Sequence, residues 1–326
     1  MGDPAGCGPQ ITAAVWQRRQ ALQLKPFFVI SDPSIYGSEI EIEPIDHPHQ
    51  ANQVFERALP ILPISLPHTP RLQTGHPCQE FAPAIVESIA LATELCQRGA
   101  ARAMVTNPIS KAVLYDAGFA FPGHTEFIAE LCAPAPAAPI LPVMMLVGGG
   151  LRVALATIHV PLMQVRDHLS QTHLVSIAET VCTALQRDFG LASPRIAFTG
   201  LNPHAGEDGS IGREELDLIN PAAEKLRQKG VQISNARPAD SVFHEALSGS
   251  FDAVIAMTHD QGLIPVKTLD MWGGVNTTLG LPIIRTSPDH GTAYEAAAAR
   301  ACRPDSLIAA ISLAQTLADH RGAHDD

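Results

Sequence analysis

Short apolar runs alternate along this chain with longer segments of helical periodicity, and this alternation constrains the fold most. Residues 152–159, 195–200 and 252–259 are rich in Ala, Val and Ile, as buried strands are. Between the last two, residues 214–230 carry apolar side chains at helical spacing and end at a glycine. Strand, helix and strand in this order predict parallel strands joined by right-handed crossovers.

The same alternation extends toward the start of the chain. We expect strands over 26–31 and 101–106, and helices over 83–99 and 110–116. The chain has 326 residues, of which 46% are hydrophobic, so it is long for a single core. These features predict an α/β protein with two domains, or one large α/β unit with insertions.

Charge and composition exclude several classes of protein. The net charge of -11 excludes a nucleic-acid groove or an anionic membrane surface as the main partner, although a small anionic substrate needs only a few local cations. No apolar run approaches the roughly 18 residues of a membrane span, and no signal pattern begins the sequence. The six cysteines are scattered without a CxxC pair, which is typical of reduced thiols. We therefore expect a cytoplasmic protein.

Histidines follow three of the predicted strands. His159 and His259 end their apolar runs, and His204 comes four residues after the run 195–200. Ligands of open parallel sheets bind outside the carboxyl ends of the strands. Three imidazoles at that edge are suited to a divalent metal with positions left open for substrate. The alternative is that each is an ordinary loop or packed histidine.

Candidate anion-binding residues lie in glycine-containing loops. His124 and Thr125 follow a Pro-Gly turn, Lys267 comes eight residues after His259, and Asn276 and Arg285 lie among glycines. Arg and Lys in such loops suit a phosphate or carboxylate; ordinary solvated side chains are the alternative. No GxGxxG or GK[ST] motif occurs, so neither the Rossmann fingerprint nor a P-loop is present. HExxH and GxSxG are also absent.

Taken together, these segments resemble the 4-hydroxythreonine-4-phosphate dehydrogenase family of pyridoxal phosphate biosynthesis. The resemblance runs in the family's order along nearly the whole chain outside 30–100. Family members have a short strand before GDPAG, whereas here Met1 directly precedes Gly2. The matching segments are GDPAGCGP (2–9), TNPISK (106–111), GHTEF (123–127), ALATIHVPL (154–162), GLNPHAGEDG (200–209), HDQGLIPVK (259–267) and GVNTTLGLPIIRTSPDHGTA (274–293).

The resemblance implies an isocitrate/isopropylmalate dehydrogenase-like fold, with two α/β/α domains and the active-site cleft between them. We place residues 1–120 with 268–326 in the first domain and 121–267 in the second. The family also implies a homodimer whose active site lies at the subunit interface. It implies one divalent metal, zinc or possibly magnesium or cobalt, on His159, His204 and His259.

Roles for other residues follow from the same resemblance. His124, Thr125, Lys267, Asn276 and Arg285 would contact substrate, and His290, Gly291 and Thr292 would bind NAD or NADP. The implied reaction is oxidation of 4-phosphooxy-L-threonine and its decarboxylation to 3-amino-2-oxopropyl phosphate, in pyridoxine 5'-phosphate biosynthesis. Spacing does not rank Asp240, Asp260 and Lys267 as the general base.

Other functions are compatible with the same residues. Related dehydrogenases act on other 4-phosphorylated four-carbon acids, such as threonate or erythronate phosphate. A metal-dependent hydrolase or phosphatase could use the three histidines without NAD. A third alternative is a small-molecule binding protein without catalytic activity. Binding of NAD would distinguish a dehydrogenase from a hydrolase.

Overall fold

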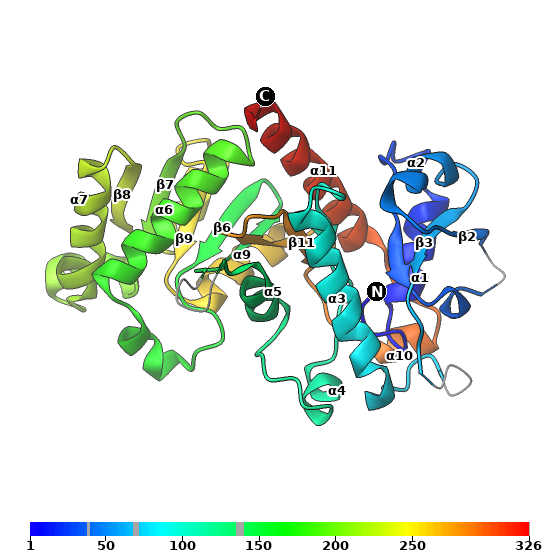
Figure 1. The fold of residues 1–326 in the computed structure, drawn as a ribbon. Helices are drawn as coiled ribbons and strands as arrows, with labels where there is room; N and C mark the ends of the chain where they lie inside the picture. Colours follow the sequence, from blue (N-terminus) through cyan, green and yellow to red (C-terminus); the bar gives the residue numbers. More distant parts are fainter. Residues whose placement is uncertain (38–39, 68–71, 135–139, 326) are drawn as a thin grey trace. The chain divides into compact units, whose positions relative to one another are not determined.

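The computed structural model describes residues 1–37, 40–67, 72–134 and 140–325 of an α/β protein in which helices and strands alternate (Figure 1). The chain divides into two compact units. Unit 1 comprises Met1–Ile140 and Pro282–Gln315, and unit 2 comprises Leu141–Leu281 and Thr316–Asp326. The units therefore divide the chain after residues 140 and 281, whereas the sequence prediction divides it after 120 and 267.

Unit 1 contains two groups of parallel strands. In one, β3 lies between β1 and β2, and in the other β4 pairs with β11. A core around Ile11, Phe55 and Ile61 fills the space between the first group and α1. The elements are α1 (Gly8–Gln17), β1 (Val29–Ser31), β2 (Ile42–Pro44), α2 (Ala51–Val54), β3 (Leu59–Pro63), α3 (Ala82–Gln97), β4 (Met104–Val105), α4 (Lys111–Asp116), α5 (His124–Cys132), β11 (Arg285–Pro288), α10 (Tyr294–Ala298) and the start of α11 (Asp305–Asp325).

Unit 2 contains six strands in the order β10-β5-β6-β9-β7-β8. Strand β5 is antiparallel to both β10 and β6, while β6, β9, β7 and β8 are mutually parallel. The elements are β5 (Val143–Gly148), β6 (Leu151–Leu155), α6 (Gln171–Arg187), β7 (Arg195–Thr199), α7 (Asn220–Gln228), β8 (Gln232–Arg237), α8 (Val242–Leu247), β9 (Ala253–Ala256), α9 (His259–Leu269) and β10 (Val275–Leu279), with 3-10 turns η5 (Leu162–His168) and η6 (Pro203–Gly209) and the π-helical turn η7 (Glu215–Ile219).

The predicted parallel pairing of the three histidine-bearing strands is confirmed. Val254 of β9 is in register with Val153 of β6 on one side and Ala197 of β7 on the other. All four residues of β9 are buried. Ile255 packs into a cluster with side chains of α6 and α7, while Val254 packs with side chains of α8 and α9. Burial on both faces explains the continuous apolar run, because a parallel strand covered by helices has no polar face.

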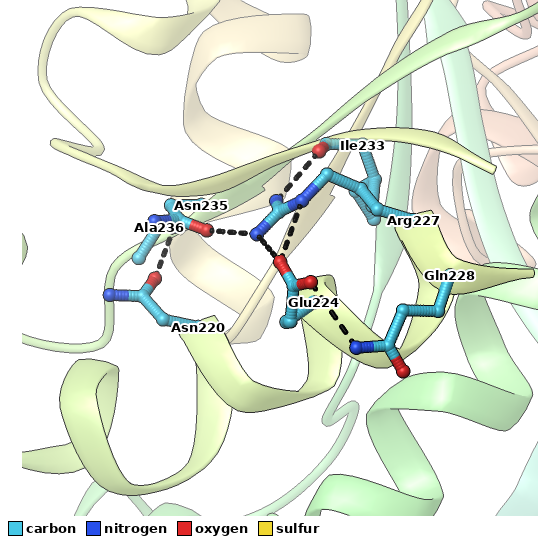
Figure 2. A network of polar contacts seen from close by, with 7 residues as sticks. All are labelled: Asn220, Glu224, Arg227, Gln228, Ile233, Asn235 and Ala236. Carbon is cyan, nitrogen blue, oxygen red and sulfur yellow. Dashed lines mark hydrogen bonds and ion pairs between the residues drawn. The ribbon is translucent and has the colours of Figure 1, made fainter. Parts of the chain in front are cut away.

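The edge strand β8 is fastened to α7 by side chains rather than by a second neighbouring strand (Figure 2). The Arg227 guanidinium donates to the Ile233 carbonyl at 3.1 Å and to Asn235 Oδ1 at 3.0 Å, and Glu224 holds the same guanidinium at 2.8 Å. Asn220 Oδ1 accepts a hydrogen bond from the backbone N–H of Ala236 at 2.8 Å. These bonds satisfy backbone groups that an edge strand would otherwise leave exposed.

The last turns of α11 are attached to unit 2 through a buried carboxylate. Both oxygens of Asp188 accept hydrogen bonds from Arg321, at 2.8 and 2.9 Å, and from Arg187, at 2.7 and 3.0 Å. Burial raises the pKa of Asp188, but the two guanidinium groups outweigh it and hold the pKa below the ordinary value of 3.8. Across the described residues, no helix has the length and apolar character to cross a membrane.

We expect Asp188→Asn to lower the free energy of unfolding by about 2 kcal/mol at pH 7, because the partly buried guanidinium groups of Arg187 and Arg321 lose the buried carboxylate that they share. The pKa of Asp188 is depressed on folding, so its contribution is present above pH 3.8 and is lost as the pH falls through the lower, folded-state pKa. Urea unfolding followed by circular dichroism measures the difference. The exposed pair Arg57–Glu43 is the control, and Glu43→Gln should cost less than about 1 kcal/mol. Equal effects of the two variants would contradict this account.

Candidate active site

The carboxyl ends of β6, β9 and β7 are held together by threonine side chains. Thr157 Oγ1 donates a hydrogen bond to the Met257 carbonyl at 2.7 Å. On the other side, Thr199 Oγ1 accepts from the Met257 backbone N–H at 3.0 Å. Thr157 and Thr199 are buried. The three strand ends are therefore fixed against one another just before the chain leaves the sheet.

Gln261 extends this connection into the first turn of α9. Its amide donates to the Gly200 carbonyl at 3.0 Å and accepts from the Thr258 backbone N–H at 3.1 Å. Thr258 caps the helix in return by accepting from the Gln261 N–H, which completes a capping box. These hydrogen bonds link the end of β7 to the start of α9, and His259 is the first residue of that helix.

His159 and His259 lie side by side at this edge. Their ring centroids are 5.7 Å apart and their planes are inclined by 43°. His159 is exposed, and the His259 side chain is 33% exposed. Asp260 Oδ1 lies 2.8 Å from His259 Nδ1. A carboxylate in that position favours the proton on Nδ1 and leaves the lone pair of Nε2 available to a ligand.

His204 is exposed and lies in η6, a turn of unusual handedness. Residues 204–208 all have positive φ, between 45° and 81°, and only Gly206 among them is a glycine. A left-handed conformation costs a residue with a side chain roughly 1 kcal/mol, and strain of this kind gathers at functional sites. The segment is thus a structured, strained turn rather than a simple loop.

The strand-end positions of the three histidines agree with the sequence prediction, but the three do not meet. Within the described residues of one chain, no group of three or more His, Cys, Asp or Glu side chains is arranged to hold a metal ion. His159 and His259 come together, and His204 does not join them. The donor set fits a metal in its chemistry, since imidazole serves zinc and cobalt alike, but one chain supplies only a pair.

Unit 1 contains a second cluster, built around the buried Arg285 of β11. Arg285 is 3% exposed, and its Nη2 donates to Thr106 Oγ1 at 2.7 Å. His124 and Thr125 form the first turn of α5, and Gly123 caps that helix. A Cβ at Gly123 would lie 3.4 Å from the Lys111 side chain. Two cationic groups from separate segments, Arg285 of β11 and Lys111 of α4, therefore lie near the start of α5.

The electrostatics of this cluster suit an anion. Burial lowers the pKa of Arg285 to about 10, so the guanidinium is charged at neutral pH. Burial and the nearby Arg285 and Lys111 hold the pKa of His124 well below its ordinary range, so its imidazole is neutral. His124 Nε2 is buried and has no hydrogen-bond partner among the described residues. A buried polar atom without a partner points to a ligand.

The loop with His290, Gly291 and Thr292 also lies in unit 1. The Thr292 carbonyl accepts from the Cys7 backbone N–H at 2.8 Å, and a Cβ at Gly6 would lie 2.9 Å from the same oxygen. The GDPAGCGP segment therefore packs directly against this loop. His290 and Gly291 are exposed.

The remaining predicted residues lie in unit 2. Asn276 is in β10, and its Oδ1 is buried with no hydrogen-bond partner among the residues described. Lys267 is in the last turn of α9 and is partly buried. Asp240 is exposed and precedes α8, while Asp260 is 81% exposed beside His259.

Several residues that shape these clusters were missed in the sequence. Thr157 stands two residues before His159 in ATIH, and Thr258 stands directly before His259 in MTH. Thr199 is the last residue of the third strand. The recurrence of threonine at the three strand ends was the available signal. Thr106 and Lys111 stand in TNPISK, and nothing in their spacing separates them from an ordinary turn.

Comparison with known proteins identifies the family of this chain. The family model of the pyridoxal phosphate biosynthetic protein PdxA matches residues 13–314. The chain is 48% identical to a 4-hydroxythreonine-4-phosphate dehydrogenase of Caulobacter vibrioides, over 98% of this chain and 97% of that protein. A crystal structure of the enzyme of that name from Klebsiella pneumoniae superposes with a TM-score of 0.87 at 36% identity, covering 98% of each chain.

A more distant solved structure is named for a different activity. A terephthalate 1,2-cis-dihydrodiol dehydrogenase from Burkholderia xenovorans superposes with a TM-score of 0.68 at 26% identity, covering 97% of this chain and 96% of that one. The family model and the full-length relatives agree with the motifs found along the sequence. The chain belongs to the PdxA family of pyridoxal phosphate biosynthetic proteins.

Proposed function

We propose that this protein is a 4-hydroxythreonine-4-phosphate dehydrogenase. It would oxidise the secondary alcohol of 4-phosphooxy-L-threonine with NAD or NADP and release carbon dioxide to give 3-amino-2-oxopropyl phosphate, in pyridoxine 5'-phosphate biosynthesis. The observation that carries the proposal is full-length membership of the family at 48% identity to a relative with this name. The paired histidines and the buried Arg285 cluster support it, because they supply metal donors and an anion site.

The metal would be held by His159, His204 and His259. A divalent ion there, zinc or possibly magnesium or cobalt, would supply Lewis-acid polarisation of the substrate's oxygen atoms. His259 is prepared for this role by Asp260, which orients its ring at 2.8 Å. Because Asp260 has this partner, Asp240 and Lys267 are the better candidates for the base that accepts the alcohol proton.

The charged ends of the substrate would be bound by Arg285, Lys267 and Asn276. Arg285 is the strongest of these candidates, because its guanidinium is buried and charged and can make paired bonds to a phosphate or carboxylate. His124 and Thr125, in the first turn of α5, would orient the same group. A neutral His124 can donate or accept a hydrogen bond without repelling the neighbouring arginine.

The cofactor would bind at His290, Gly291 and Thr292. These residues form a loop that contacts the GDPAGCGP segment, because the Cys7 N–H donates to the Thr292 carbonyl and Gly6 packs against the same oxygen. A loop held in this way by a neighbouring segment could present N–H groups to a dinucleotide without the Rossmann fingerprint. A dinucleotide held there would supply the hydride acceptor, and the residues of the loop would orient it.

A homodimer would complete the site at the subunit interface. One chain brings only two of the three imidazoles together, so a second copy is the simplest source of the missing ligand. Large apolar side chains are exposed on the segments that follow the same strand ends. Met163 in η5 is 90% exposed and Ile264 in α9 is 63% exposed. Exposed apolar side chains of this size are typical of a surface that a partner covers.

A second candidate is a dehydrogenase for another 4-phosphorylated four-carbon acid, such as threonate or erythronate phosphate. The similarity to the terephthalate dihydrodiol dehydrogenase favours keeping this candidate, because that enzyme has a similar fold at 26% identity and is named for a different substrate. A metal-dependent hydrolase is the less favoured alternative, since it has no use for a dinucleotide.

Reduction of NAD or NADP across a panel of substrates tests the proposed function. We expect reduced cofactor to form with 4-phosphooxy-L-threonine, to form much more slowly with threonate and erythronate 4-phosphates, and to stop when a chelator removes the metal. Absorbance of the reduced nicotinamide measures the rate. A higher specificity constant for one of the other acids would transfer the assignment to that substrate, and absence of dinucleotide binding would point to the hydrolase.

Replacing His204 by alanine tests the metal assignment. We expect His204→Ala to lose bound metal and dehydrogenase activity while its circular dichroism spectrum is unchanged, because the side chain is exposed and contributes no core packing. Elemental analysis of the purified protein gives the metal content. His244→Ala, at another exposed histidine of unit 2, is the matched control and should keep both metal and rate. Full metal content in the His204 variant would refute the ligand assignment.

Mixing two inactive variants tests the interface. His204→Ala chains and His259→Ala chains should each be inactive alone, and co-expression should restore activity, because a mixed dimer can assemble one complete site from intact histidines of different copies. If the three ligands came from one chain, no mixture of these variants would contain a complete set. Activity and metal content of the tagged, purified heterodimer give the answer.

A further inference from the structure

The turn that carries His204 rests on a buried carboxylate, Glu215. This side chain is 1% exposed and lies at the start of the π-helical turn η7. Its Oε1 accepts hydrogen bonds from the backbone N–H groups of Leu201 and Asn202, both at 2.8 Å. Its Oε2 accepts a hydrogen bond from Asn202 Nδ2 at 3.0 Å. One carboxylate therefore takes three donors from the two residues that lead from β7 into the turn. A buried carboxylate needs such donors, and here they all come from one segment.

The space around Glu215 leaves no room for other side chains. A Cβ at Gly206, in the middle of the left-handed run, would lie 2.5 Å from Glu215 Oε2, and one at Gly200 would lie 3.1 Å from Oε1. A Cβ at Gly212 would overlap the Asn202 amide. The glycines of this segment thus let the backbone wrap closely around a single carboxylate and its asparagine partner.

His204 itself has no comparable support. Its side chain is exposed, and its backbone is the first left-handed residue of the run. Inside the turn, the Ala205 N–H donates to the Asn202 carbonyl at 3.2 Å and the Ile211 N–H to the Gly206 carbonyl at 3.1 Å. The first of these bonds ends on Asn202, which Glu215 holds. The backbone beside His204 is therefore connected through Asn202 to Glu215.

We infer that Glu215 is a positioning residue that holds the strained left-handed turn 204–208 and thereby presents the His204 imidazole for metal binding. Glu215 does not itself bind the ion, because both of its oxygens are occupied by donors of the turn. The inference rests on the proposed function only in its last step, the binding of metal by His204. The earlier step, control of the turn's conformation, stands on contacts within unit 2 alone.

The experiment compares Glu215→Gln with Glu214→Gln. Both carboxylates accept a hydrogen bond from Asn202 Nδ2, in the case of Glu214 at 2.8 Å. Glu214, however, is partly exposed and, within the part of the chain that the structure describes, has no hydrogen bond to the backbone of residues 201–211. In Glu215→Gln an amide N–H₂ group faces donors in place of an acceptor. We expect amide hydrogen exchange to accelerate in residues 201–211 but not in α6, and the dissociation constant for Zn²⁺ or Co²⁺ to rise about 10- to 100-fold. Glu214→Gln should change the constant less than about twofold.

Gly206→Ala provides a second route that leaves the carboxylate in place. Its Cβ would meet Glu215 Oε2 at 2.5 Å, so the variant should loosen the same turn. If the two residues act through one structure, Gly206→Ala should weaken metal binding much less in the Glu215→Gln background than in the wild type. Additive effects would overturn the inference even if one single variant folds poorly.

The outcomes separate a failure of the inference from a failure of the proposed function. Unchanged exchange in 201–211 and unchanged metal affinity in Glu215→Gln would overturn the inference. Faster exchange spread over all of unit 2, with metal affinity unchanged, would show that Glu215 stabilises the fold without positioning His204. If the wild type binds neither ion, the proposed metal site fails, whereas the exchange measurement still decides whether Glu215 controls the turn.

Discussion

Two parallel pairings, β6 with β9 and β9 with β7, decide where the functional groups of unit 2 lie. Because all three strands point the same way, their carboxyl ends share one edge, and the residues that follow them leave the sheet together. Thr157 Oγ1 donates to the Met257 carbonyl and Thr199 Oγ1 accepts from the Met257 N–H, and these two hydrogen bonds hold the strand ends in register. The positions of His159 and His259, whose ring centroids lie 5.7 Å apart, follow from this arrangement.

Much of this was predictable from the sequence, because apolar runs and the residues that follow them determine strand direction. ATIH and AMTH place a histidine directly after a buried strand, and parallel pairing brings such residues to one edge. The distance between the rings was not predictable in the same way. It depends on register and on the Thr157–Met257 bond, which join residues 100 positions apart in the chain.

The conformation of the third strand end could not be predicted from composition. GLNPHAGEDG has the glycines and proline of an exposed loop, and the sequence supports only that. Its left-handed turn depends on Glu215, which lies in a segment that the periodicity assigns correctly to a helix. A helical pattern predicts which apolar side chains face the core. It does not predict that a glutamate in the same segment is buried and accepts hydrogen bonds from backbone N–H groups.

In the cluster of unit 1, the charge of Arg285 affects the protonation of His124. Arg285 is charged and buried, and His124 beside it is kept neutral by burial and by that charge. An anion bound there would offset the desolvation of the guanidinium and would raise the pKa of His124 at the same time. Binding of the proposed phosphate or carboxylate would therefore move the pKa of His124 from its lowered value toward the ordinary one.

The left-handed turn also changes how surface exposure should be interpreted in this protein. Residues 204, 207 and 208 are exposed, and by ordinary criteria they would tolerate almost any polar substitution. Their positive φ imposes a different rule, in which Gly, Asn and Asp are favoured and β-branched residues are excluded whatever their polarity. Sequence variation at these positions should therefore be limited by backbone handedness, and a library that samples them by hydrophobicity alone would consist largely of misfolded turns.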